Sequence, residues 1–225
     1  LEFLVNLSAF TAIVSMFHGY GETVASAVTI AFNWDMMSFV PMVGMQVAVM
    51  TLVGQNLGRG NEVVAIRSAY SGFKLNLIYS GMMMMIFLLL PSLLSEAFRP
   101  NDVSGWSDIK SVAVPMIMMM SIYPISDGVF IIFSGAIRGG GDTSWAMIAS
   151  GILHWVAAVI TWIATKHLQL PPLAAWGIFL TCFSFLGLTF WLRFRSGKWR
   201  GREVLPPESK RPPSDIEPNP LYIAE

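Results

Sequence analysis

Six long apolar segments divide this sequence and limit what the chain can fold into. They lie at about 1–17, 24–53, 64–97, 111–136, 143–165 and 173–194. A helix needs roughly 20 residues to cross a bilayer. The first segment is already apolar at Leu1, so we expect its helix to be truncated and the chain to be a piece of something longer. The pattern predicts an all-α, polytopic membrane protein, with six transmembrane helices in one bundle over residues 1–196.

The composition agrees with a membrane protein and excludes other classes. The chain is 54% hydrophobic and 12% charged, whereas a soluble domain carries about twice that share of charge. Its 14 basic and 14 acidic residues cancel, so no net field attracts nucleic acid. Cys182 is the only cysteine in the sequence, which excludes a disulfide framework. From Gly197 onward, basic residues and then the Pro-rich stretch "PPESKRPPSDIEPNP" predict a disordered tail over 197–225.

The placement of lysine and arginine predicts the orientation of the helices. Six crossings put both ends of the chain on the same side. That side holds eight basic residues and the other holds three, namely Arg59, Arg67, Arg138, Arg193, Arg195, Lys198, Arg200 and Arg202 against Arg99, Lys110 and Lys166. Because cytoplasmic loops carry an excess of such residues, we predict a multi-pass protein of the inner (plasma) membrane with a cytoplasmic C-terminus.

One acid, Asp127, lies inside the apolar stretch "MMMSIYPISDGVFIIFSGAIRG", where its charged form costs several kcal/mol. It precedes Arg138 by eleven residues, or ~16 Å of helix, which places it near the middle of a ~30 Å hydrocarbon core. Tyr123 lies one turn earlier on the same face. Pro124 cannot donate its backbone bond, so it frees a carbonyl near residue 120 and kinks the helix. These features predict a cation or proton site, and the alternative is a protonated Asp127 that only bonds a neighbouring helix.

Two further acids lie in the apolar segments. Asp35 lies well inside the second segment, with Pro41 about two turns later. Counted back from His18, Asn6 lies ~18 Å down its helix, near the midplane, and Glu2 lies ~24 Å down, near the inner face. We find no lysine or arginine at comparable depth, so a cavity lined by these acids favours a cationic ligand and repels an anionic one.

Enzymatic chemistry has no support in the sequence. The stretch "RGGGDT" shares only its glycines with a phosphate-binding P-loop and lacks the Lys-Ser/Thr ending. It predicts a tight turn in which Asp142 or Thr143 caps the next helix. We recognise no nucleophile–base pair or metal cluster.

Two motifs resemble the multidrug and toxic compound extrusion (MATE) family. "PMVGMQVAVMTLVGQNLGRGN" (41–61) resembles the second helix and loop of a six-helix half, and "YPISDGVFIIFSGAIRGGGDT" (123–143) resembles the fourth. The family usually shows Gly-Gln-x-x-Gly in the first loop and Arg-Gly-x-Gly-Asp-Thr in the second. The matching residues here are Gly54, Gln55 and Gly58, then Arg138, Gly139, Gly141, Asp142 and Thr143. The resemblance covers roughly residues 1–195.

The resemblance implies one half of a 6+6 transporter, and cytoplasmic loops at these motifs fit the C-terminal half, helices seven to twelve. In the branch typified by sodium-coupled bacterial exporters, the tenth helix carries a Tyr-x-x-x-Asp pair, which Tyr123 and Asp127 match. That branch has a glutamate midway along the seventh helix. Asn6 occupies this position here, and Glu2 lies one turn away.

The function that this resemblance implies is an antiporter that exports organic cations and drugs by alternating access, driven by Na⁺ or H⁺. We expect the coupling ion, including Na⁺ as a bound metal, at Asp127, with Tyr123, Asp35, Glu2 and Asn6 as further coupling residues. Pro124 and Pro41 would be hinges. We expect no cofactor, and the lipid bilayer and an N-terminal six-helix half as partners.

Two alternatives stay open. A lipid-linked saccharide flippase of the same superfamily would need deep Arg or Lys residues to hold pyrophosphate, and another half could supply them. A six-helix scaffold or channel subunit would transport nothing by itself.

Overall fold

The computed structural model describes residues 2–99 and 104–200, and every regular element in these ranges is a helix. The predicted all-α membrane bundle is therefore confirmed. The residues of the tail from 201 onward, together with Leu1 and 100–103, lie outside the described part. The elements are α1 (Glu2–His18), α2 (Glu22–Gly58), α3 (Glu62–Leu89), α4 (Pro91–Glu96), α5 (Trp106–Met120), α6 (Tyr123–Gly139), α7 (Thr143–Trp162), a π-helical turn (Ile163–His167) and α8 (Pro172–Arg195).

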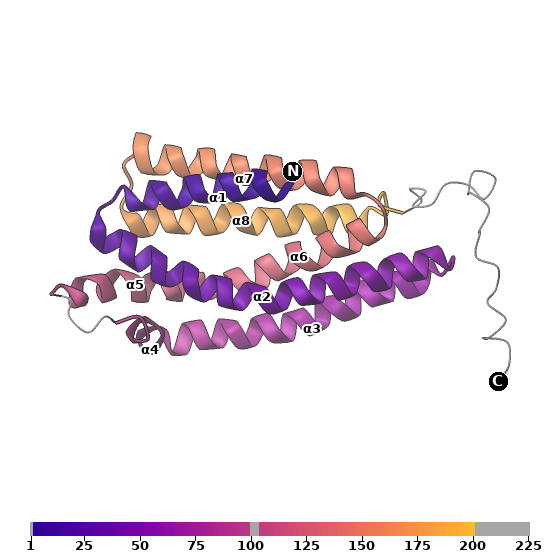
Figure 1. Cartoon of the computed structure of the whole chain (residues 1–225), viewed down its shortest axis with the longest axis horizontal. Coiled ribbons are helices and arrows are strands. Elements are labelled where there is room, and N and C mark those ends of the chain that lie inside the picture. The colour runs from indigo at the N-terminus through magenta and orange to yellow at the C-terminus, as the bar shows by residue number, and fades with distance from the viewer. Residues whose placement is uncertain (1, 100–103, 201–225) are drawn as a thin grey trace, which may run out of the picture.

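The long helices run side by side, with α6 at the centre of the bundle (Figure 1). On one side of α6 lie α8, α7 and α1, and on the other side lie α2 and α3. Four helices are long and apolar enough to span a membrane: α2, α3, α7 with its π-helical turn, and α8. The pair α5–α6 passes the same test when its two helices are taken together, and α1 is a shorter apolar helix of 17 residues. The described residues therefore hold four such spans, or five if the bent pair counts as one, where the sequence predicted six.

Two of the predicted segments are each divided into two helices, and proline explains both divisions; a kink was predicted at Pro124 and none at Pro91. The segment 64–97 divides because α3 ends at Leu89 and α4 begins at Pro91. The segment 111–136 divides at Ser121 and Ile122, and α5 meets α6 at an angle of 47°. Pro124 lies in the first turn of α6, where its missing N–H costs nothing, and its ring would clash with the carbonyl of Met120 in a continuous helix.

Pro41 behaves differently, because it lies within the continuous 37-residue helix α2. Figure 1 shows that α2 changes direction along its length. A proline in a helix interior removes one backbone hydrogen bond and bends the helix, which is tolerated in a membrane span when neighbours satisfy the freed group. The predicted hinge at Pro41 stays a prediction.

The buried side chains form two apolar clusters along the bundle. One contains Phe17, Phe32, Trp176 and Phe179, and the rings of Phe32 and Trp176 have centroids 5.1 Å apart. The other contains residues such as Ile137, Phe133, Phe190, Phe194 and Trp199.

The second cluster includes a residue that the sequence assigned to the tail. Trp199 is 0% exposed, and its ring stacks on Phe194 with centroids 4.9 Å apart. The next residue, Arg200, pairs with Glu62 at the start of α3 at 2.6 Å. The packed part of the chain therefore continues to Arg200, four residues beyond the predicted boundary at 196.

Candidate functional site

A layer of buried polar side chains crosses the bundle between the two apolar clusters. The polar residues come from four helices, and along each helix they lie between or beside residues of the two apolar clusters. The layer comprises Asp35 and Ser38 on α2, Asn76 and Ser80 on α3, Asp127 on α6, and Ser150 and His154 on α7. Polar groups at this depth in a membrane protein are expensive and usually mark a functional site. We therefore place the candidate site in this layer.

The centre of the layer is a pair of acids on packed helices. Asp127 on α6 is 7% exposed and Asp35 on α2 is 9% exposed. They lie close enough to interact electrostatically, and Tyr123 interacts with both. The structure therefore brings together three of the predicted coupling residues. Two carboxylates that interact in this way repel each other, so the binding of a proton or cation at the pair is favoured.

Helix α3 packs against both helices that carry the acids. The Tyr79 hydroxyl donates to the Ser38 carbonyl at 3.0 Å, and the Ser38 hydroxyl donates to the Asp35 carbonyl at 2.8 Å. Asn76 is 1% exposed, and its Nδ2 donates to Ser80 Oγ at 3.2 Å.

The contact between α3 and α6 depends on a glycine beside Asp127. A Cβ at Gly128 would lie 1.9 Å from Asn76 Nδ2, so only glycine admits the amide here. The sequence interpretation overlooked Asn76, although an asparagine inside an apolar run with Ser80 one turn later was a usable signal.

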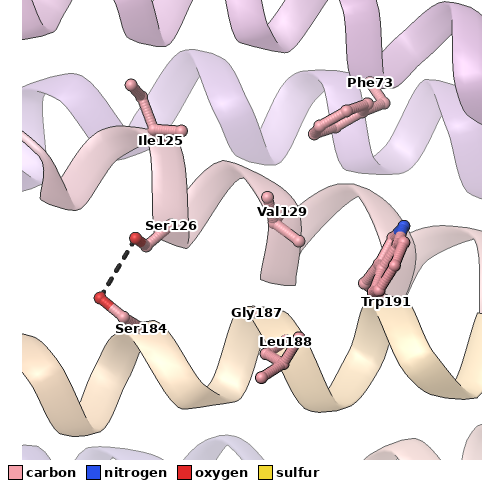
Figure 2. A pocket seen from close by; sticks show the side chains of 8 residues that line it. All are labelled: Phe73, Ile125, Ser126, Val129, Ser184, Gly187, Leu188 and Trp191. Atoms are coloured by element: carbon pink, nitrogen blue, oxygen red, sulfur yellow. Dashed lines mark hydrogen bonds between the residues drawn. The ribbon is translucent and has the colours of Figure 1, made fainter.

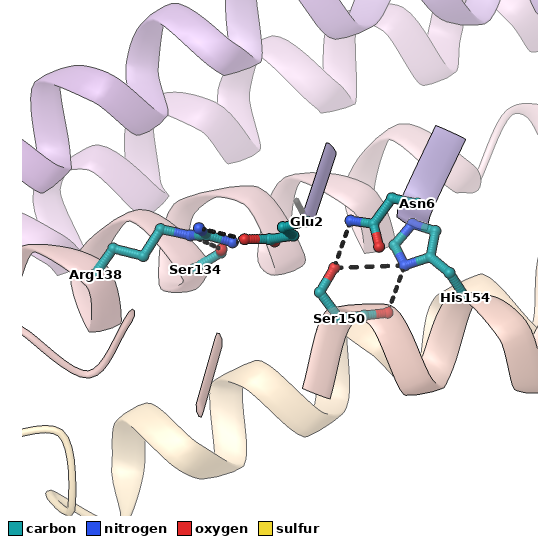
Figure 3. Close-up of polar contacts among 6 residues, drawn as sticks. All are labelled: Glu2, Asn6, Ser134, Arg138, Ser150 and His154. Atoms are coloured by element: carbon teal, nitrogen blue, oxygen red, sulfur yellow. Dashed lines mark hydrogen bonds and ion pairs between the residues drawn. The ribbon is translucent and has the colours of Figure 1, made fainter. Parts of the chain in front are cut away.

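Glu2 does not join the acid pair. Arg138 donates two hydrogen bonds to the Glu2 carboxylate, one of them at 2.8 Å, and its Nε donates to Ser134 Oγ at 3.0 Å (Figure 3). The sequence places no lysine or arginine at the depth of the acids, but the Arg138 side chain nevertheless reaches the Glu2 carboxylate. The reason is the length of the arginine side chain, which extends from the last turn of α6 to the start of α1.

Asn6 bonds to α7 and not to either acid of the pair. Its Nδ2 donates to Ser150 Oγ at 2.9 Å (Figure 3). His154 Nδ1 lies 2.8 Å from the Ser150 carbonyl oxygen and 3.5 Å from Ser150 Oγ. The sequence interpretation set no role for His154, and the signal that could have shown one is Ser150 four residues earlier on the same face.

The two glycine motifs meet where α2 and α6 approach closely. A Cβ at Gly54 would lie 3.3 Å from the Gly139 carbonyl oxygen, and a Cβ at Gly139 would lie 2.4 Å from the carbonyl oxygen of Met50. Gly141 has a φ of +86°, a conformation that favours glycine. These glycines permit backbone contact and a tight turn.

Asp142 occupies the N-cap position of α7 and Thr143 is the first residue of that helix, but the predicted side-chain capping hydrogen bond is not formed. The Asp142 carboxylate accepts a hydrogen bond from Arg193 Nε at 3.0 Å. The Arg193 guanidinium also lies 4.8 Å from the centre of the Trp145 ring. The second motif therefore ties the α6–α7 turn to the end of α8.

A cavity of about 330 Å³ lies beside α6, between α8 and α3 (Figure 2). A hydrogen bond of 3.1 Å from Ser184 to Ser126 crosses one end of it. Its other lining residues are Phe73, Ile125, Val129, Gly187, Leu188 and Trp191. Neither acid of the pair belongs to this lining, so the cavity is separate from the candidate site.

Comparison with known proteins agrees with this architecture. The model of the MatE family matches residues 1–163. The probable multidrug resistance protein NorM of Thermotoga maritima is 31% identical over 177 residues, which are 78% of this chain and 37% of that protein. The multidrug resistance protein PmpM of Pseudomonas aeruginosa is 26% identical over 200 residues, which are 88% of this chain and 36% of that protein.

Solved structures show the same fold. A MOP superfamily transporter from Pyrococcus furiosus aligns with a TM-score of 0.75 at 18% identity, over 92% of this chain and 47% of that one. A multidrug resistance MATE family transporter in an outward-facing conformation aligns with a TM-score of 0.74 at 17% identity, over the same shares of the two chains. The chain thus spans less than half the length of the proteins it resembles.

Proposed function

Because this chain belongs to the MatE family, whose members are transporters and not enzymes, we propose that it is the C-terminal six-helix half of an antiporter. The antiporter exports organic cations, including drugs, in exchange for Na⁺ or H⁺. The observation that carries this proposal is the pair of Asp35 and Asp127, brought from two helices into a polar layer between apolar clusters. The names of the bacterial relatives, which are multidrug resistance proteins, support the substrate class.

The acid pair accounts for exchange through competition between cations. A Na⁺ ion or proton that binds at Asp127 neutralises charge that would otherwise attract an organic cation. Because the site is shielded from water, repulsion between two bound cations would be strong there. The acids therefore bind either the coupling ion or the organic cation, but not both. Binding of the coupling ion from outside therefore expels the organic cation, and the empty acids attract the next one.

The break between α5 and α6 supplies a place for movement. It lies at Ser121 and Ile122, one to two turns before Asp127 in the sequence. Pro124 has no N–H to donate to the carbonyl of Met120, so one backbone hydrogen bond is missing where α5 meets α6. Two rigid half-spans that meet at 47° can change their angle when the charge near Asp127 changes. Pro124 is therefore the first candidate hinge and Pro41 the second.

The remaining parts of the transporter follow from the same proposal. This chain spans 37% of the Thermotoga relative. An N-terminal six-helix half would therefore form the other wall of a substrate cavity between the two halves. The basic residues predict the inner membrane and a cytoplasmic C-terminus. Glu2 and Asn6 are assigned to a second polar cluster, so the coupling site proper consists of Asp127, Asp35 and Tyr123.

The test is ion-driven efflux by the full-length transporter that contains this chain, reconstituted in vesicles. Asp127→Asn keeps the size of the side chain and removes its charge, so we expect efflux driven by either a Na⁺ or a pH gradient to be abolished. Asp108→Asn is the matched control, because Asp108 is exposed in the first turn of α5, and this variant should transport like the wild type. Wild-type efflux by Asp127→Asn would show that the acid is structural.

A further inference from the structure

A second polar cluster joins α1, α6 and α7, and its titratable centre is His154. We propose that His154, which is hydrogen-bonded to Ser150 in a cluster that also contains Asn6 and the Glu2–Arg138 ion pair, is a second proton-binding site of this transporter. The inference rests on the proposed antiport function and adds a site on α7 to the acid pair on α2 and α6. Figure 3 shows the six polar residues that form the cluster.

The imidazole ring is held in one orientation. His154 is 9% exposed, and aromatic rings from two other helices meet it. Phe183 of α8 contacts it edge to face with centroids 5.2 Å apart, and Phe130 of α6 lies 6.1 Å away. Phe183 also lies beside Tyr123, with ring centroids 6.1 Å apart. A ring fixed in this way is preorganised to take up and release a proton without moving.

The hydrogen bonds decide which nitrogen takes up the proton. The Ser150 carbonyl oxygen can only accept, so His154 Nδ1, at 2.8 Å, must carry a hydrogen and donate it. The neutral ring therefore keeps its lone pair on Nε2, which is the atom that binds the second proton. Asn6 completes the arrangement, because its Nδ2 donates to the Ser150 hydroxyl at 2.9 Å and orients it.

Burial disfavours a positive charge on the His154 ring, and the neighbouring Glu2 carboxylate offsets part of that cost. Asn6 Oδ1 is buried and has no hydrogen-bond partner among residues 2–99 and 104–200, so it offers a lone pair to a nearby cation. Glu2 on α1 interacts electrostatically with His154. Arg138 on α6 donates two hydrogen bonds to the Glu2 carboxylate. Its positive charge offsets the negative charge of Glu2 and so weakens the attraction of Glu2 for a protonated His154.

The other charged groups on the elements around α7 lie near its ends. Arg193 on α8 pairs with Asp142 at the first turn of α7. Lys166 and His167 are exposed in the π-helical turn that follows α7. The acid of α6, Asp127, belongs to the pair with Asp35. Glu2 is therefore the charge that acts on His154, and Arg138 is the partner of Glu2.

The Glu2–Arg138 ion pair would link protonation of His154 to the movement of helices. Helix α1 packs mainly on α7 and α2, while α6 packs on α2, α3 and α8, and the Glu2–Arg138 pair ties α1 to α6. If α6 moves away from α1, Arg138 leaves and the Glu2 carboxylate is free to hold the imidazolium of His154. When the pair forms again, the carboxylate is neutralised and the proton is released. Proton uptake at His154 is therefore linked to the separation of α1 from α6.

The test measures protons released when an organic cation binds to the full-length transporter in weakly buffered detergent. Ethidium is the probe and a pH dye is the readout. His154→Gln should bind ethidium but release fewer protons than the wild type, and its pH profile of efflux should lose one titrating step. The matched controls His18→Gln and His167→Gln change exposed histidines and should match the wild type.

Three outcomes separate this inference from the proposed function. If Asp127→Asn stops ion-driven efflux while His154→Gln releases as many protons as the wild type, the His154 site is wrong and the antiporter stands. If the wild type exports ethidium with Na⁺ and releases no proton, the His154 site is also wrong. If the wild type shows no ion-driven efflux at all, the proposed function fails.

If His154→Gln does not fold, the inference is tested on the wild-type protein instead. In the wild type with ¹⁵N-labelled histidine, the His154 imidazole signal should titrate within the range of about pH 5 to 8 in which an ordinary histidine changes charge. Assignment uses the His18→Gln and His167→Gln variants. A single protonation state across the range overturns the inference.

Discussion

The close approach of α2 and α6 predicts that Gly139→Ala destabilises the bundle. An added Cβ would lie 2.4 Å from the Met50 carbonyl oxygen and 3.1 Å from Val53 Cβ. Ordinary contacts of a Cβ begin at 3.4 Å, so the two backbones would have to part by about 1.0 Å (3.4 − 2.4). Because a backbone carbonyl cannot rotate out of the way as a flexible side chain can, the helices themselves must shift.

The magnitude follows from the cost of overpacking. Inserting a methyl group into a close-packed contact costs about 1–3 kcal/mol. For a domain of this size each kcal/mol lowers the melting temperature by about 2–4 °C, so Gly139→Ala should melt roughly 2–12 °C lower than a variant with the same helix propensity and no clash. Gly58→Ala is that variant, since Gly58 ends α2 as Gly139 ends α6 and no atom lies within 4 Å of its added Cβ.

The assay is thermal unfolding in detergent, followed by a fluorescent thiol probe or by loss of the monodisperse peak after heating. Both variants gain the same helix propensity on replacing glycine by alanine, so their difference isolates the clash. Equal melting temperatures for Gly139→Ala and Gly58→Ala would refute the packing argument. They would also show that the glycine motifs do not act by bringing α2 and α6 together.

Two further predictions concern the surface of the protein. Arg59→Cys should be protected and Asp108→Cys labelled by an impermeant thiol reagent applied to intact cells, in a background without other reactive cysteines; the reverse pattern would invert the orientation. The hydrogen bond from Lys110, at 2.7 Å, holds the pKa of Glu96 below its usual range. Since this pKa is depressed in the folded state, the stabilisation is present above the ordinary glutamate pKa and is lost as the pH falls through the folded one. Lys110→Met should therefore lower the melting temperature near neutral pH and leave it unchanged in acid, and a difference that persists in acid would contradict the assignment.

The sequence by itself determined that the chain forms a bundle of membrane helices. Each span follows from local properties: an apolar run long enough to cross the bilayer, bounded by turn residues that end the helix. The kink near Pro124 was also local, because the proline ring excludes a continuous helix whatever surrounds it. The break at Pro91 also has a local cause, but it was not predicted, because leucines continue the apolar run on both sides of the proline.

The tertiary structure decided which side chains meet. Asp127 and Tyr123 share a helix, so their proximity could be predicted, whereas Asp35 lies on another helix. The pairing of Glu2 with Arg138 spans 136 positions and that of Asn6 with Ser150 spans 144. Such contacts depend on the rotation of each helix about its own axis. In a soluble bundle an amphipathic stripe reveals that rotation. In a membrane the lipid-facing and core-facing sides are both apolar, so the sequence carries little signal of which face turns inward, and only packing settles it.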